Sequence, residues 1–169
     1  MCSSDLFAWD VEHRLADGKP GAVPTEAVEM QSTEFREGVV YERNGVRVTS
    51  ILVEHGGAIR PAYGFRIDYR GRSVVLSGDT EPSDNLVRHA TGVDLLIHQV
   101  AMGLSNRTGP EQAGGVFSRA RPKLAVYYHI ALLAPPGGRE PTEADLVQAT
   151  RKAYGGPLVV GEDLMRLVV

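Results

Sequence analysis

The chain has 169 residues, of which 43% are hydrophobic and 23% are charged, and its net charge is −3. This is the composition of an ordinary globular domain with a buried core; it gives no reason to expect bulk attraction to nucleic acid, and no apolar run approaches the about 20 residues that span a bilayer. The single cysteine, Cys2, excludes an internal disulfide and a multi-cysteine zinc site, so that a metal site would need histidines and carboxylates.

The first residues do not resemble the rest of the chain. Residues 1–6 read as Met-Cys-Ser-Ser-Asp-Leu, which one reading frame of a common sequencing adapter would encode. We therefore expect residues 1–6 to be a non-native leader and residues 7–169 to be the C-terminal part of a domain; the alternative is a short polar terminus. Residues 17–26 are rich in glycine and proline and predict a loop.

From Gly38 onward the pattern indicates regular structure. Two pairs of β-rich runs predict two hairpins: residues 39–43 with 46–53 across Asn44-Gly45, and residues 62–69 with 73–76 across residues 70–72. After Asp79 helices and strands alternate. Helices are expected after Ser83, after a capping box at residues 108–111 and after Thr142, and strands at 93–97, 124–128, 157–160 and 164–168. Antiparallel strands followed by this alternation predict a layered α/β fold.

Polar side chains follow several of the predicted strands. Asp79, His98 and His129 each end an apolar run, and His55 comes shortly after another. Ligands of α/β proteins bind beyond the carboxyl ends of strands, and histidine with carboxylate is a ligand set that zinc accepts. The alternatives are a turn role for Asp79 and buried, backbone-bonded roles for His98 and His129.

Three segments carry a resemblance to a known family. They resemble, in the same order, motifs of the metallo-β-lactamase superfamily in its ribonuclease Z and arylsulfatase-like branch. The segments are residues 53–55 followed by 61–67, the Gly-Asp-Thr segment at 76–80, and residues 126–130 around His129. The resemblance implies the C-terminal half of an αββα sandwich. It also implies two zinc ions, with His55 on one metal, His129 on the other and Asp79 as the bridging, catalytic carboxylate.

The sequence departs from that family's pattern in three places. The upstream His-x-His-x-Asp-His motif is absent. Gln99 and Arg107 stand where the ribonuclease Z branch carries a glutamate and a histidine thought to assist proton transfer. Gln99 is no base and Arg107 stays protonated, although Arg107 could hold a substrate anion, with His98 beside it; the alternative is a solvated arginine. Members that process tRNA carry a long inserted arm between the segments that match residues 61–67 and 76–80. Here only residues 68–76 stand at that place, which argues against tRNA as the substrate.

The resemblance implies a fragment of a dinuclear-zinc hydrolase that cleaves a phosphodiester, sulfate ester or related ester. The rival is a non-catalytic module of the same fold that binds an anionic ligand. We expect the chain alone to bind zinc weakly and to be inactive, with no membrane association and with no compartment assigned. An uncovered apolar face would pair with a missing N-terminal half or with a second copy in a homodimer. Six residues are candidates for that face: Val48, Leu52, Val74, Leu76, Leu95 and Ile97.

Overall fold

The computed structural model describes Trp9 and residues 33–57, 59–104 and 107–168. It divides into two units, Met1–Phe35 and Arg36–Val169. The second unit contains every helix and strand discussed below. The expected leader at residues 1–6 and the expected loop at 17–26 lie outside the described residues.

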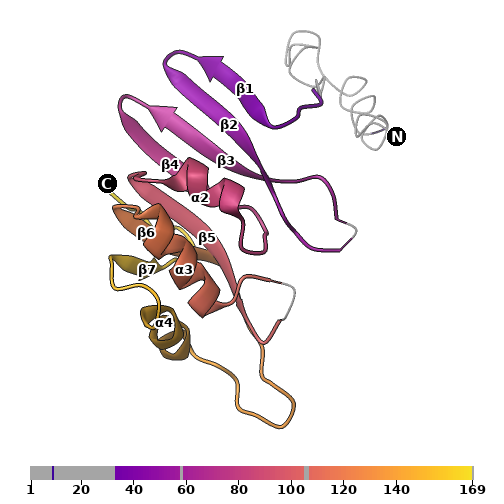
Figure 1. The fold of residues 1–169 in the computed structure, drawn as a ribbon, viewed down its shortest axis with the longest axis vertical. Coiled ribbons are helices and arrows are strands. Elements are labelled where there is room, and N and C mark those ends of the chain that lie inside the picture. The colour runs from indigo at the N-terminus through magenta and orange to yellow at the C-terminus, as the bar shows by residue number, and fades with distance from the viewer. Residues whose placement is uncertain (1–8, 10–32, 58, 105–106, 169) are drawn as a thin grey trace, which may run out of the picture. The chain divides into compact units, whose positions relative to one another are not determined.

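A single seven-stranded sheet organises the second unit (Figure 1). Its strands lie side by side in chain order: β1 (Gly38–Arg43), β2 (Val46–Val53), β3 (Ala62–Tyr69), β4 (Arg72–Leu76), β5 (Leu95–Met102), β6 (Leu124–Leu132) and β7 (Leu158–Val160). The pairs from β1 to β4 are antiparallel and the pairs from β4 to β7 are parallel. The predicted change from hairpins to helix–strand alternation is thereby confirmed.

Both predicted hairpins are present, and each has a two-residue turn. Asn44 and Gly45 have φ values of 54° and 78°, and Arg70 and Gly71 have values of 48° and 76°. Left-handed backbone at both central positions is typical of the tight hairpin turn that matches strand twist. The second turn is shorter than predicted, because Arg72 already pairs with Tyr69 in the ladder.

Three helices connect the parallel strands: α2 (Asp84–Ala90), α3 (Pro110–Ala120) and α4 (Glu143–Arg151). The hydroxyls of Ser83 and Thr142 cap α2 and α4 as predicted. The predicted capping box at 108–111 is wrong. Gly109 is the N-cap of α3, and its amide donates to Gln112 Oε1 at 2.9 Å, while Thr108 is buried and donates elsewhere. The last predicted strand, 164–168, is also wrong, since that segment forms a turn and irregular backbone.

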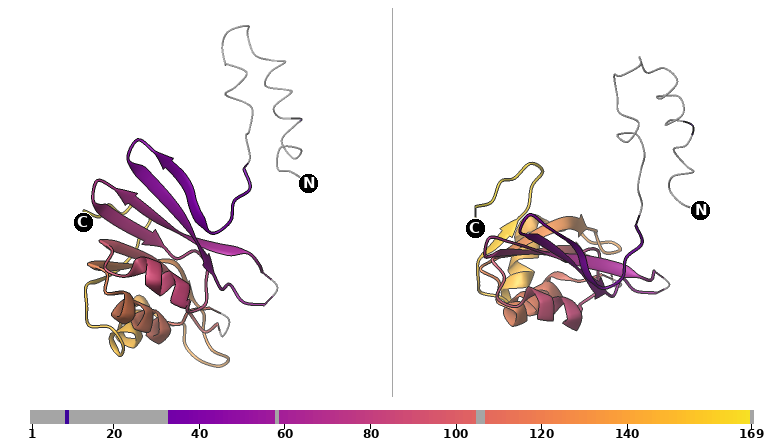
Figure 2. Two further views of the ribbon diagram at one scale, coloured as in Figure 1. Left: turned by 45° about the horizontal axis from the view of Figure 1, so that its top comes forward. Right: turned by 90° about the horizontal axis from the view of Figure 1, so that it is seen from above.

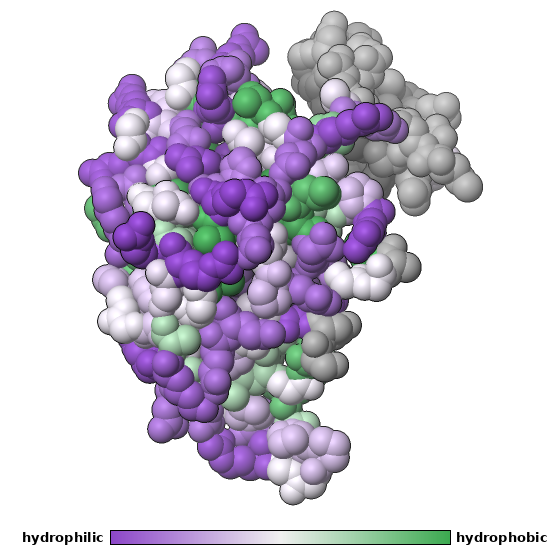
Figure 3. All heavy atoms as spheres, in the orientation of Figure 1, coloured by the Kyte–Doolittle hydropathy of each residue, from purple (hydrophilic) through white to green (hydrophobic). Residues whose placement is uncertain are grey.

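The helices cover one face of the sheet (Figure 2). Their apolar residues, such as Leu86, Phe117 and Leu146, join the strand residues of that face in one core. The outer side of this helical layer is mainly hydrophilic (Figure 3). None of the helices in the described part combines the length and hydropathy of a membrane span.

The six residues predicted for the uncovered face do share one face, opposite the helices. The strand register places Val48 beside Ile67, Ile67 beside Val74, and Val74 beside Leu95. Leu76 and Ile97 are likewise paired with each other. Most of these side chains are half-buried and Leu52 is 41% exposed, although Leu95 is only 7% exposed. Self-association through this face stays a prediction.

Candidate metal centre

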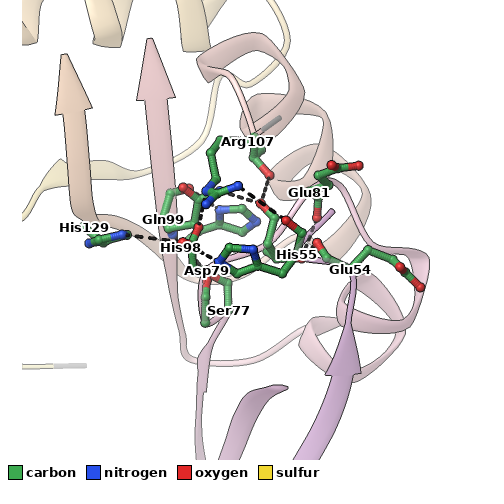
Figure 4. A network of polar contacts seen from close by, with 12 residues as sticks. Glu54, His55, Ser77, Asp79, Glu81, His98, Gln99, Arg107 and His129 are labelled. Carbon is green, nitrogen blue, oxygen red and sulfur yellow. Dashed lines mark hydrogen bonds and ion pairs between the residues drawn. The ribbon is translucent and has the colours of Figure 1, made fainter. Parts of the chain in front are cut away.

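Four segments bring polar side chains to one place: the loops after β2, β4 and β5, and a bulge within β6 (Figure 4). Asp79 follows β4 and is the centre of the group. His55 Nε2, which follows β2, lies 2.8 Å from Asp79 Oδ2, and His129 Nε2 lies 3.8 Å from the same oxygen. Arg107 Nε lies 3.0 Å from the other oxygen, Asp79 Oδ1. The structure therefore brings together four of the five side chains that the sequence singled out.

The backbone of Gly78 sets the position of Asp79. Gly78 has φ of +66°, and a Cβ at this position would lie 2.3 Å from the carbonyl oxygen of Tyr63. Only glycine fits such a close approach in the left-handed region. The chain can thus turn sharply out of β4 and direct Asp79 away from the core.

Thr80 connects the Asp79 loop to its neighbours, a role that the sequence analysis missed. Its hydroxyl lies 3.0 Å from the carbonyl oxygen of Glu54, and the amide of Glu81 donates to that same oxygen at 2.5 Å. These bonds hold the segment before His55 against the segment after Asp79. The threonine that follows the aspartate in the Gly-Asp-Thr segment was the sequence signal for this role.

His129 lies within a strand rather than at its end, contrary to the prediction. β6 continues to Leu132, and its register against β5 shifts between Tyr128 and Ile130, so that His129 is the extra residue of a bulge with φ of 46°. Bulges redirect side chains beside functional sites. The His129 side chain is 66% exposed and also borders a hollow of about 500 Å³ that includes Glu162 and Asp163.

His98 lies in the core, not at the surface of the site. β5 continues beyond it to Met102, and the side chain has no exposed area. Its ring meets that of Phe117 edge-on at 5.8 Å, and Nδ1 lies 2.5 Å from the carbonyl oxygen of Gln99. The substrate contact predicted for His98 therefore has no exposed surface through which to act. Burial lowers the pKa of His98 to about 4 from an ordinary value of 6.5.

This lowered pKa predicts a pH-dependent stability. The unfolded chain takes up the His98 proton near pH 6.5 and the folded chain only near pH 4, so that acid favours unfolding across this interval. Relative to a His98→Leu variant, the unaltered chain should lose up to about 3 kcal/mol of unfolding free energy between pH 6.5 and pH 4. Urea unfolding of both proteins at several pH values measures the difference between their unfolding free energies. If the two free energies change with pH in parallel, His98 does not have the lowered pKa.

Gln99 is buried beside the site and holds the Asp79 loop. It is 1% exposed, and its Nε2 donates to the carbonyl oxygen of Thr80 at 2.5 Å. Thr108 Oγ1 donates to the same oxygen at 2.8 Å. The side-chain amide of Gln99 thus donates a structural hydrogen bond. A carboxylate at the same position could not donate, and its oxygen would face the carbonyl oxygen of Thr80.

A Gln99→Glu variant should consequently be less stable. Its carboxylate would lose the bond to Thr80 and bury a charge, at a cost of about 1–3 kcal/mol. The loss should grow with rising pH, because burial favours the protonated acid, which can still donate. Gln112→Glu is the matched control, since Gln112 is exposed and only accepts a bond from Gly109. Equal thermal unfolding midpoints for both variants at pH 8 would contradict this role.

His55, Asp79 and His129 can form only part of a metal site. Within the described part of the chain, no three His, Cys, Asp or Glu side chains form a ready metal-binding group. The two histidines instead each approach Asp79, at 2.8 and 3.8 Å. Two ligand atoms of one tetrahedral zinc ion lie about 3.3 Å apart when both bonds are about 2.0 Å long. The distances suit one histidine per metal and a shared aspartate.

His55 has one further polar atom to account for. Its Nδ1 is buried and has no hydrogen-bond partner among the residues for which the structure gives positions. Buried ring nitrogens normally have a partner, so Nδ1 requires one beyond the described residues, while the metal contact considered above is at the other ring nitrogen, Nε2. The imidazole and carboxylate donors present fit zinc, with further ligands required from outside this group.

Comparisons with known proteins agree with this architecture. The family described as "Beta-lactamase superfamily domain" matches residues 5–130. The chain is 29% identical to the ribonuclease Z of Mycobacterium tuberculosis over 177 residues, which cover 96% of this chain and 62% of that protein. The chain thus spans about three fifths of the length of this relative.

Solved structures show the same fold. The metallo-beta-lactamase fold protein YhfI from Bacillus subtilis matches with a TM-score of 0.60 at 15% identity, covering 72% of this chain and 49% of that one. The short form of human tRNase Z matches with a TM-score of 0.53 at 19% identity, covering 75% of this chain and 44% of that one. The chain therefore belongs to the beta-lactamase superfamily, with the metallo-beta-lactamase fold, and its sequence is similar to those of ribonucleases Z.

Proposed function

We propose that this chain supplies part of the active site of a dinuclear-zinc hydrolase that cleaves a phosphodiester or a related ester. The observation that carries the proposal is the position of Asp79, whose Oδ2 lies 2.8 Å from His55 Nε2 and 3.8 Å from His129 Nε2. A carboxylate between two imidazoles suits a bridge between two cations, because its charge offsets their repulsion. The family places the chain among hydrolases with ribonuclease Z-like relatives.

Each residue has a distinct part in this proposal. His55 and His129 would each hold one zinc ion, and Asp79 would hold both. When bound, zinc supplies an electrophile for a phosphoryl or carbonyl oxygen and activates water as a nucleophile. Arg107, 20% exposed at the edge of the group, would orient the anionic part of the substrate, because its planar guanidinium matches phosphate and sulfate oxygens.

A non-catalytic, anion-binding module is the second candidate. Two observations favour it: Gln99 is buried in a structural bond, and Arg107 pairs with Asp79. Neither side chain offers a proton acceptor at neutral pH. The two candidates share the anionic ligand and differ only in turnover.

The preferred substrate is a small ester, because the turn between β3 and β4 leaves no room for an inserted arm. The relatives keep tRNA as a candidate substrate, because they are named ribonuclease Z and tRNase Z. Precursor tRNA therefore belongs among the substrates to be tested.

The test is a hydrolysis assay of the longest product of the gene that carries this chain. Bis(4-nitrophenyl) phosphate, 4-nitrophenyl sulfate and a precursor tRNA would be offered with zinc and with a chelator. Zinc-dependent release of nitrophenol from the phosphodiester is the expected result. Cleavage of tRNA alone would correct the substrate class. Phosphate binding without turnover of any substrate would favour the non-catalytic module.

A further inference from the structure

Arg107 contacts the carboxylate that the proposed metals would share. Its Nε lies 3.0 Å from Asp79 Oδ1, and its Nη1 lies 3.4 Å from the carbonyl oxygen of His55 (Figure 4). Asp79 thus has His55 beside one oxygen and Arg107 beside the other, and the contact with Arg107 is an ion pair rather than a hydrogen bond, since Oδ1 has no hydrogen-bond partner in the described structure. The two side chains are 20% and 26% exposed, so that solvent screens their interaction only in part.

The charges of this group are balanced without a metal. A guanidinium stays protonated at any pH at which proteins fold, so Arg107 neutralises Asp79. A divalent cation at the same carboxylate would meet a positive charge already in place. The guanidinium repels a divalent cation at the neighbouring carboxylate, because like charges at this separation repel each other.

We propose that Arg107 is a built-in competitor for the metal at Asp79 and thereby sets the affinity of this site for zinc. The proposal rests on the ligand assignment made under the proposed function. The ion pair lies at Oδ1, whereas both histidines approach Oδ2, so that the guanidinium acts on a metal at Asp79 through its charge. Zinc bound at Asp79 must therefore overcome the repulsion of the guanidinium or displace it.

A purely structural ion pair makes the opposite prediction. If Arg107 only fastened its loop to Asp79, its removal would loosen the ligands and weaken zinc binding. Competition predicts instead that removal of the charge strengthens binding. The direction of the change separates the two roles, without any measurement of catalysis.

The experiment measures zinc affinity of the 169-residue chain by competition with a chromophoric chelator. Arg107→Gln should bind zinc about tenfold more tightly, or more, than the unaltered chain, because the repulsion between the guanidinium and the metal is removed. Arg107→Lys keeps the charge and should stay within a few-fold of it. Arg139→Gln is the matched control, because Arg139 forms a comparable pair with Asp145, at 2.6 Å, in a part of the chain that supplies none of the proposed ligands.

Circular dichroism establishes that each variant is folded, and Arg107→Ala provides a second neutral variant. The proposal is overturned if the folded neutral variants bind zinc no more tightly than the unaltered chain does. So does the absence of zinc binding by the neutral variants up to millimolar zinc. Tighter binding combined with an inactive gene product would leave the competition in place and reject only the hydrolase.

Discussion

Replacing Asp79 with asparagine should weaken zinc binding by about 100-fold or more and abolish any zinc-dependent hydrolysis. Changes to groups that merely support metal ligands cost about 10- to 100-fold in affinity, so the loss of the shared ligand should cost at least as much. Asparagine has nearly the same size, but it lacks the charge and replaces one oxygen with a nitrogen that carries two hydrogens. The substitution therefore tests the carboxylate and not the space that it fills.

Asp84→Asn is the control for this substitution. Asp84 lies on α2, is 74% exposed, and pairs with Arg119 at 2.7 Å away from the site. Chelator competition and hydrolysis of bis(4-nitrophenyl) phosphate should be unchanged in the control. If Asp79→Asn binds zinc as tightly as the control does, Asp79 is not a ligand and the metal assignment fails.

Gly78→Ala should destabilise the folded chain by about 3 kcal/mol or more. Two costs add: an L-residue in left-handed backbone costs about 1–2 kcal/mol, and the new Cβ would lie 2.3 Å from the carbonyl oxygen of Tyr63. Relief of that contact requires movement of β3 or of the Asp79 loop. Zinc affinity should therefore fall together with stability.

Gly71→Ala separates the two costs. Gly71 has a similar φ, +76°, but a Cβ there would meet no atom within 4 Å. Only the conformational cost applies, so urea unfolding should show a clearly smaller loss for Gly71→Ala. Equal losses for the two variants would show that the close approach to Tyr63 does not constrain the site.

Local patterns predicted much of the fold correctly. Asn44-Gly45 predicts its hairpin because both residues adopt left-handed backbone readily, and Ser83 and Thr142 predict helix starts because their hydroxyls satisfy free amides. The pattern failed where local signals were ambiguous. Residues 164–168 have an apolar composition that fits a strand, but they pair with no other strand in the described structure.

The sequence by itself determined the order of most elements, because this follows from residue type and short-range spacing, and the family resemblance supplied the candidate ligands His55, Asp79 and His129. Only the tertiary structure decided which polar side chains reach the site. His98 faces the core and His129 sits on a bulge because the pairing of β5 with β6 fixes their register. Arg107 meets Asp79 from 28 positions further along the chain, since α2 and β5 intervene between them. Contacts across such separations depend on how strands pair and helices pack, which no local pattern specifies.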